Sequence, residues 1–139
     1  MPKFSESSEK RLATCHPKLR ELFQEVVKGY DCTVLCGFRG QDEQDSAFEK
    51  GTSKVKWPES KHNNFPSLAV DVAPYPIDWK DTNRFYHFAG YVRAVAERLG
   101  IKVRQGVDWN GNLDFKDESF FDGPHVEIVL DAPNVFKAE

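Results

Sequence analysis

The chain has 139 residues, 40% of them hydrophobic, and a formal net charge of −3. This size and composition predict one packed domain, residues 1–139, whose core needs no disulfide staples. The scattered Lys and Arg argue against nucleic-acid binding, and no run approaches the roughly 20 apolar residues of a membrane span.

Hydrophobic periodicity predicts helices and short strands that alternate along the chain. An apolar stripe at helical spacing predicts a first helix from Ser5 to Gly29, which Pro17 bends or divides. The clearest helix begins at Asp81 or Thr82 and ends before a glycine. The predicted set is helix 5–29, strand 33–38, helix 41–50, loop 51–66, strand 69–73, helix 81–99, strand 101–107, loop 108–119 and strand 126–130. This order predicts an α+β domain in which helices pack on one side of a small antiparallel sheet.

Two histidines and an aspartate carry the strongest chemical signal. His62 lies in a polar loop, Asp71 interrupts the apolar run LAVDVA, and His125 opens the last strand. A charged residue inside so apolar a strand is costly to bury unless it is paired or bound to a cation. Two neutral imidazoles and one carboxylate are the ligand set of a catalytic zinc, with a fourth position open for water. The simpler alternatives are a solvated loop histidine and a buried Asp–Arg pair.

Two further carboxylates lie close to His125 in the sequence. Asp122 precedes it by three residues and is a candidate for the base that activates water. Glu127 follows it by two residues, so both share one face of a strand. Glu127 competes with Asp122 for the role of base, but we favour it as the acceptor that holds a histidine N–H. The alternative is an edge strand whose polar face lies in water.

Together these motifs resemble a family of zinc peptidases. The family includes D-Ala-D-Ala carboxypeptidases and dipeptidases and the L-alanyl-D-glutamate endopeptidases of bacteriophages. The resemblance spans nearly the whole chain and is carried by the motifs Gly37-Phe38-Arg39-Gly40…Gln44, Ser60-x-His62…Ala69-x-Asp71 and Asp122-x-x-His125. One departure is visible, since nine residue steps separate His62 from Asp71 where the family usually has seven. A loop can absorb two residues if its ends stay fixed, so the ligands are expected to survive.

The resemblance implies a role for each of these residues. It implies one zinc ion held by His62, Asp71 and His125, a general base, Asp122, and an arginine that stabilises the oxyanion, Arg39. An ordinary exposed turn residue is the alternative for Arg39. Ser60 supports the loop or touches the substrate.

The resemblance also implies a Hedgehog/D-Ala-D-Ala-peptidase-like fold and a function. The expected function is a zinc-dependent peptidoglycan peptidase that cleaves the stem peptide at the L-alanyl-D-glutamate bond, in phage-type host-cell lysis. A D,D-carboxypeptidase or dipeptidase acting on D-Ala-D-Ala stays open, as does a non-catalytic zinc-binding interaction module. Asp122 argues against the module, because a binding site needs no base. We expect a monomer that reaches the cell wall through a holin.

The cysteines and the N-terminus bear on the compartment. Cys15, Cys32 and Cys36 are an odd number without zinc-finger spacing, so disulfides are not expected. Cys32 and Cys36 are predicted to be small buried residues of a strand. The first residues lack the apolar segment of a signal peptide, which predicts a cytoplasmic protein.

The segment from Asp108 to Glu118 carries alternating oxygen side chains, a weak indication of a calcium loop. It lacks the Gly and the closing Glu of an EF-hand, so a solvated turn is favoured. The resemblance keeps calcium open as the second interpretation, since some phage relatives bind calcium in this region.

Overall fold

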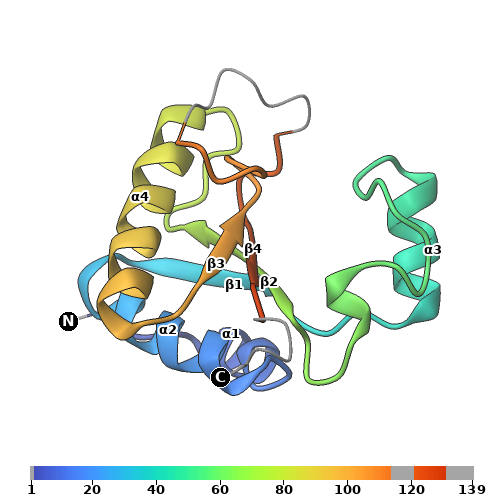
Figure 1. Ribbon diagram of the computed structural model, residues 1–139, viewed down its shortest axis with the longest axis horizontal. Coiled ribbons are helices and arrows are strands. Elements are labelled where there is room, and N and C mark those ends of the chain that lie inside the picture. The colour runs from blue at the N-terminus through green and yellow to red at the C-terminus, as the bar shows by residue number, and fades with distance from the viewer. Residues whose placement is uncertain (1, 114–120, 131–139) are drawn as a thin grey trace.

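A four-stranded antiparallel sheet organises the computed structural model of the chain, which describes residues 2–113 and 121–130 (Figure 1). The elements are α1 (Glu6–Leu12), α2 (Pro17–Gly29), β1 (Cys32–Cys36), α3 (Gln41–Glu49), the 3-10 helix η1 (Lys61–Asn63), β2 (Ala69–Pro74), α4 (Thr82–Leu99), β3 (Val103–Gln105) and β4 (His125–Ile128). The strand order is β1-β2-β4-β3, and each neighbouring pair is antiparallel. The predicted α+β class with a small antiparallel sheet is confirmed.

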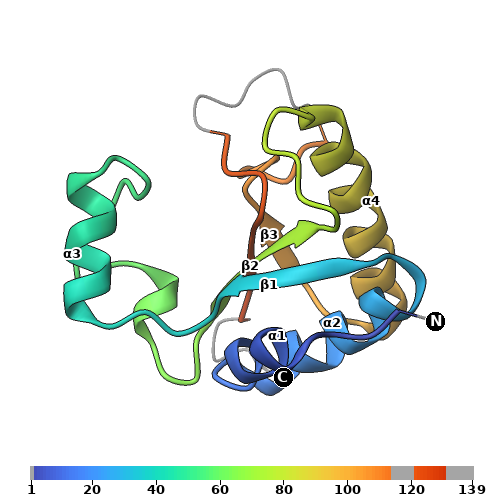
Figure 2. The same cartoon turned by 180° about the vertical axis from the view of Figure 1, so that it is seen from behind.

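Three of the helices cover one side of this sheet, whereas α3 lies away from it on the other side (Figures 1 and 2). Helices α1, α2 and α4 supply buried apolar residues to a common core. Helix α3 has only one buried side chain, Gln44, so it has no apolar face to place on the sheet. None of the helices in the described ranges has the length and apolar composition that crossing a bilayer requires.

The predicted first helix is divided into α1 and α2, as Pro17 suggested. Pro17 begins α2, and the side chain of His16 accepts a hydrogen bond from the backbone N–H of Lys18 at 3.0 Å. The chain between the helices bonds to the segment before β2: His16 N donates to the Ser67 carbonyl at 2.9 Å, and Ser67 N donates to the Thr14 carbonyl at 2.8 Å. The break between the helices therefore fixes the start of β2.

The two faces of the sheet differ in chemistry. Strand residues on the helix side are almost fully buried in the core, namely Val34, Val70, Val72, Val126 and Ile128. Because strand side chains alternate, Asp71, His125 and Glu127 point to the opposite face. A register shift between Val34 and Cys36 in β1 brings Cys36 opposite Asp71. One face of the sheet is thus buried in the apolar core, and the other face carries the polar groups.

Strand register decides which polar groups meet. Asp71 of β2 is the Cα partner of His125 in β4, and Glu127 is the partner of Arg104 in β3. Strand β1 ends at Cys36 instead of residue 38, because the chain turns off at Gly37, where a side chain would collide with the Thr14 hydroxyl and the Arg11 carbonyl. The observed pairs place the polar side chains of three strands next to one another.

Candidate active site

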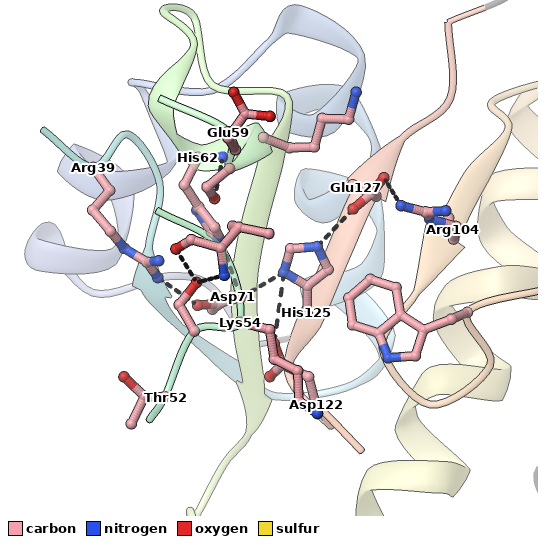
Figure 3. Close-up of a pocket in the computed structure, with 15 residues that line it drawn as sticks. Arg39, Thr52, Lys54, Glu59, His62, Asp71, Arg104, Asp122, His125 and Glu127 are labelled. Carbon is pink, nitrogen blue, oxygen red and sulfur yellow. Dashed lines mark hydrogen bonds and ion pairs between the residues drawn. The ribbon is translucent and has the colours of Figure 1, made fainter. Parts of the chain in front are cut away.

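The polar face of the sheet forms one wall of a cavity of about 370 Å³. Residues 52–55 and 59–62, which follow α3, form the facing wall. Figure 3 shows that side chains from both walls point into this space. The cavity brings together all the residues that the sequence singled out for chemistry: Arg39, Ser60, His62, Asp71, Asp122, His125 and Glu127.

Asp71 is the centre of the site. Its Oδ1 atom lies 3.3 Å from His62 Nε2 and 3.4 Å from His125 Nδ1. The three side chains are 17%, 3% and 9% exposed, so they meet in a place that water barely reaches. Asp71 also belongs to two overlapping groups of potential metal ligands, one with Cys36 and His62 and one with Asp122 and His125.

Two atoms of this cluster are buried without a hydrogen bond in the described part of the chain, His62 Nε2 and Asp71 Oδ1. Buried polar atoms normally have partners, so two such atoms side by side call for a missing group. Tetrahedral zinc holds nitrogen and oxygen ligands at about 2.0–2.2 Å, which sets neighbouring ligand atoms about 3.3–3.6 Å apart. The separations of 3.3 and 3.4 Å from Asp71 Oδ1 fit this geometry, whereas His62 and His125 belong to different groups of potential ligands, so their nitrogens must approach each other to bind one ion.

The outer nitrogen of each histidine is held by the protein. His62 Nδ1 lies 2.8 Å from the Gly37 carbonyl, and His125 Nε2 lies 2.9 Å from Glu127 Oε1. If these nitrogens carry the protons, each ring turns a lone pair toward Asp71. Acceptors of this kind fix the orientation of histidine ligands in metal sites. Glu127 therefore lies where an acceptor for a histidine N–H was expected.

The electrostatics of the cluster demand a cation. Burial lowers the pKa of His62, but the negative charge of Asp71, 3.3 Å away, outweighs burial and raises that pKa to about 10. Burial acts in the opposite direction on Asp71, yet the two histidines hold the pKa of its carboxyl well below its usual range. Asp71 is thus an ionised carboxylate, which Arg39 balances together with protonated imidazoles or a metal ion.

Asp122 lies at the edge of this cluster, with its Oδ2 atom 3.9 Å from His125 Nδ1. Burial and the negative charge of Asp71 raise the pKa of Asp122 to about 6. Its backbone is fixed by a hydrogen bond from Asp122 N to the Gly106 carbonyl at 3.0 Å. A side chain at Gly106 would collide with the Asp122 carbonyl, so this glycine allows the close approach. Asp122 is placed and poised to exchange a proton near neutral pH.

Arg39 points into the cavity and is only 16% exposed. Its guanidinium donates to Gln44 Oε1 at 3.0 Å and lies 3.6 Å from Asp71 Oδ2. The alternative of an exposed turn residue is therefore wrong for Arg39. The buried Asp–Arg pair considered for Asp71 does exist, but the two histidines share the same carboxylate.

Comparison with known proteins identifies the family. The model of the family described as phage L-alanyl-D-glutamate peptidase matches residues 1–129. The chain belongs to this family. It is 37% identical over 135 residues to the L-alanyl-D-glutamate peptidase of Escherichia phage T5, which covers 91% of this chain and 98% of that protein. The crystal structure of the Serratia marcescens L-Ala D-Glu endopeptidase ChiX shares the fold, with a TM-score of 0.72 and 24% identity over 99% of this chain and 96% of that one. The resemblance inferred from the three motifs is confirmed.

The structural role of Gln44 was not predicted from the sequence. Its side chain is fully buried and uses both of its ends. Gln44 Oε1 accepts from Arg39 and from Asn63 Nδ2, and Gln44 Nε2 donates to Ser53 Oγ at 2.9 Å and to the Val55 carbonyl at 2.7 Å. The motif contained Gln44, but in a polar helix it looks like a solvated residue. Gln44 joins the segment around Arg39 to the loop that forms the far wall.

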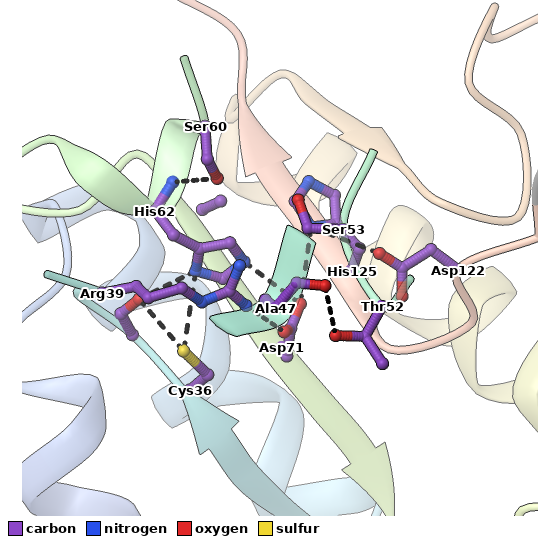
Figure 4. A network of polar contacts seen from close by, with 12 residues as sticks. Cys36, Arg39, Ala47, Thr52, Ser53, Ser60, His62, Asp71, Asp122 and His125 are labelled. Atoms are coloured by element: carbon purple, nitrogen blue, oxygen red, sulfur yellow. Dashed lines mark hydrogen bonds and ion pairs between the residues drawn. The ribbon is translucent and has the colours of Figure 1, made fainter. Parts of the chain in front are cut away.

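Ser60 and Cys36 lie on opposite sides of His62 (Figure 4). Ser60 Oγ accepts from the backbone N–H of His62 at 3.1 Å and caps η1, a contact that matches the loop-support option. Cys36 Sγ lies 3.9 Å from His62 Nδ1 and is half-buried. The expectation of a buried strand cysteine is correct for Cys32 and wrong for Cys36, which the register shift in β1 turns toward the site.

The proposed calcium segment is described only up to residue 113, and residues 114–118 lie outside the described ranges. Asp108 Oδ2 accepts from the backbone N–H of Leu113 at 2.8 Å, and Asn110 Oδ1 accepts from that of Asn112 at 3.1 Å. These oxygens stabilise a local turn. Calcium binding gains no support from them.

Proposed function

We propose that the chain is a zinc-dependent peptidoglycan peptidase that hydrolyses the L-alanyl-D-glutamate bond of the stem peptide. Membership of the phage L-alanyl-D-glutamate peptidase family supports the reaction and the substrate. One observation supports the mechanism above all others: Asp71 Oδ1 lies 3.3 and 3.4 Å from one nitrogen of each of two buried histidines.

His62 Nε2, Asp71 Oδ1 and His125 Nδ1 would hold the zinc ion. Zinc supplies Lewis acidity, which lowers the pKa of a water molecule to about 7 and polarises the substrate carbonyl. Glu127 keeps the His125 ring turned toward Asp71 by accepting from Nε2 at 2.9 Å. The Gly37 carbonyl does the same for His62 at 2.8 Å.

Asp122 acts as the general base and then as the acid. It accepts a proton from the attacking water, whose oxygen forms a bond to the carbonyl carbon of L-alanine. It then gives the proton to the nitrogen of D-glutamate as the C–N bond breaks, so a free amine leaves. Burial and the charge of Asp71 raise the pKa of this carboxyl above its usual range, which favours returning the proton to the leaving amine.

Arg39 stabilises the negative charge that grows on the carbonyl oxygen. Its guanidinium is fixed between Gln44 and Asp71, so little reorganisation is needed when the charge appears. A base and an anion-stabilising group beside a metal-binding cluster favour catalysis over a non-catalytic interaction module. Both named relatives are L-alanyl-D-glutamate peptidases, which favours that bond over D-Ala-D-Ala.

Mass spectrometry of digested peptidoglycan tests this function. Purified sacculi are incubated with the zinc-loaded protein, with the chelated protein and with the Asp122→Asn variant. The proposal predicts stem peptides that begin with a free D-glutamate amine, formed only by the loaded wild-type protein. Release of D-alanine instead would assign the D,D-peptidase activity, and an undigested wall would contradict the peptidase.

We also propose that residues 1–139 act as one monomeric catalytic unit in host-cell lysis. Site residues come from positions 39 to 127, and the helices before them pack in the core behind the sheet that carries the site. In this proposal the protein waits in the cytoplasm and reaches peptidoglycan through a holin. Lysis timing in cells that express the protein with and without a holin tests the route.

A further inference from the structure

Arg104 is a cavity residue that the proposed mechanism does not use. In Figure 3, Arg39 and Arg104 lie on opposite sides of the Asp71–His125 pair. Arg104 NH2 lies 3.0 Å from Glu127 Oε2, the oxygen of Glu127 that His125 does not bind. Its guanidinium carbon lies 5.4 Å from the centroid of the Trp109 ring, which itself lies 5.0 Å from the His125 ring. A carboxylate and an aromatic ring thus hold this guanidinium beside the reacting groups.

The guanidinium keeps binding capacity on its cavity side. An arginine has five N–H donors in a planar fork, and Glu127 is its only ion-pair partner within residues 2–113 and 121–130. The side chain of Arg104 is 47% exposed, whereas that of Glu127 is 6% exposed. Lys61 lines the same cavity and its charge also acts on Glu127, so two cations act on a carboxylate that already binds His125; Glu59, the neighbouring carboxylate of the lining, is exposed. This end of the cavity therefore favours a further anion.

The substrate carries such an anion beside the scissile bond. D-Glutamate has two carboxyl groups, and the stem peptide continues through the γ-carboxyl. The α-carboxyl then stays on the carbon next to the scissile nitrogen, where it is either a free carboxylate or, in amidated walls, a neutral amide. Any group that recognises this carboxylate must lie beside the metal ligands. Arg104 meets this condition through Glu127, which lies 3.0 Å from Arg104 NH2 and 2.9 Å from His125 Nε2.

Arg39 is the other arginine of the cavity, but its position suits a different task. It is 16% exposed and already contacts both Asp71 and Gln44. Arg104 has one ion-pair partner and is almost half exposed. We propose that Arg104 binds the free α-carboxylate of the D-glutamate residue and makes the site selective for stem peptides that are not amidated there. This inference rests on the proposed function and identifies the α-carboxylate as the substrate group that the site recognises.

A pair of synthetic stem peptides tests the inference. The two peptides are identical except that one contains γ-linked D-glutamate and the other contains D-isoglutamine. The zinc-loaded wild-type protein should cleave the D-glutamate peptide with a kcat/KM about 10–100-fold higher, the scale of one charge-assisted hydrogen bond. Arg104→Gln should bring this ratio to about 1, mainly through a loss on the D-glutamate peptide. Arg104→Lys should keep part of the preference, because a point charge replaces a planar fork.

Arg93→Gln is the matched control, since Arg93 also pairs with one carboxylate, Glu97, at 3.1 Å, but lies on α4 outside this cavity. It should leave the ratio unchanged. Equal cleavage of both peptides by the wild-type protein would overturn the inference, as would Arg104→Gln or Arg104→Lys lowering both rates in the same proportion. The second result would show that Arg104 acts only through Glu127. Absence of any cleavage between L-alanine and D-glutamate by the wild-type protein would instead overturn the proposed function.

Discussion

The two walls of the cavity are built by different physics. The sheet wall carries His125, Asp71 and Glu127 on paired strands, whose other face lies in the apolar core. The facing wall, which we call the α3 lobe (residues 40–63), is organised around the polar side chain of Gln44. Hydrophobic packing thus fixes Asp71 and His125, whereas hydrogen bonds fix the third proposed metal ligand, His62, and Arg39.

The difference predicts unequal local stability. Behind Asp71 and His125, the side chains of Val70, Val72 and Val126 are at most 4% exposed. In the α3 lobe, Phe48 and Val55 are 36% and 39% exposed, so little apolar surface is removed from water there. Regions with few buried apolar contacts open more readily than the core. The sheet wall should therefore remain ordered when the α3 lobe opens.

The largest expected effect within an intact sheet wall comes from Asp122→Asn. Losing the base should lower kcat by about 10²–10⁴-fold, while the fold and zinc content stay as in the wild-type protein. Steady-state kinetics on a stem peptide measures the loss, with the exposed Asp45→Asn of the α3 lobe as the control. If Glu127→Gln is inactive and Asp122→Asn is active, the two carboxylates have exchanged roles.

Arg39→Ala tests the junction between the two walls. If the guanidinium stabilises charge only in the transition state, kcat should fall by about 10²–10³-fold with a smaller change in KM. Arg39→Lys should rescue poorly, because a flexible ammonium cannot bind Gln44 and face the cavity in one geometry. A wild-type kcat in Arg39→Ala would remove Arg39 from the mechanism.

Glu127→Gln sharpens the account of the sheet wall. The amide keeps the shape of the side chain but weakens the bond to His125 Nε2 and the pairing with Arg104. Zinc affinity or activity should fall by about 10–100-fold, as for other partners of metal ligands. A competition titration with a chelator measures the affinity, and an unchanged value together with unchanged activity would mean that Glu127 does not hold His125.

Gln44→Ala tests the α3 lobe alone and should have the smallest effect on the reaction. Removing the side chain leaves Arg39, Asn63 and Ser53 without a shared partner, at a cost of about 1–3 kcal/mol in local stability. Hydrogen exchange should accelerate about 10–100-fold for amides of the lobe and remain unchanged in β2 and β4. Activity should fall by about 10-fold as Arg39 loses its support. Equal acceleration in the sheet would contradict the separation of the two walls.

The residues proposed to react could be predicted from the sequence more fully than the residues that hold them in position. Asp71 interrupts an apolar run, and a charge in such a strand needs a partner whatever the fold. Its pairing with His125 depends on a register between distant segments, which no local pattern encodes.

The supporting residues have no such local signal. In the sequence, Gln44 and Arg104 resemble ordinary surface residues. Their roles depend on the position of the α3 lobe and on the pairing of β3 with β4, which only the structure shows. Cys36 faces the site only because of the register shift in β1. The predicted strand 101–107 is shortened to Val103–Gln105, because the chain turns after Gln105, where Asp108 N donates to the Gln105 carbonyl at 3.0 Å.

Zinc content after gel filtration tests the central claim, that three side chains of this cavity hold a catalytic metal. The wild-type protein should retain about one zinc ion per chain. Asp71→Ala and His125→Ala should lose tight zinc binding. His87→Ala should bind zinc as the wild-type protein does, because His87 lies on α4, outside the cavity, and contacts the Tyr30 hydroxyl at 2.8 Å. Full zinc content in a folded Asp71→Ala or His125→Ala variant would contradict the account.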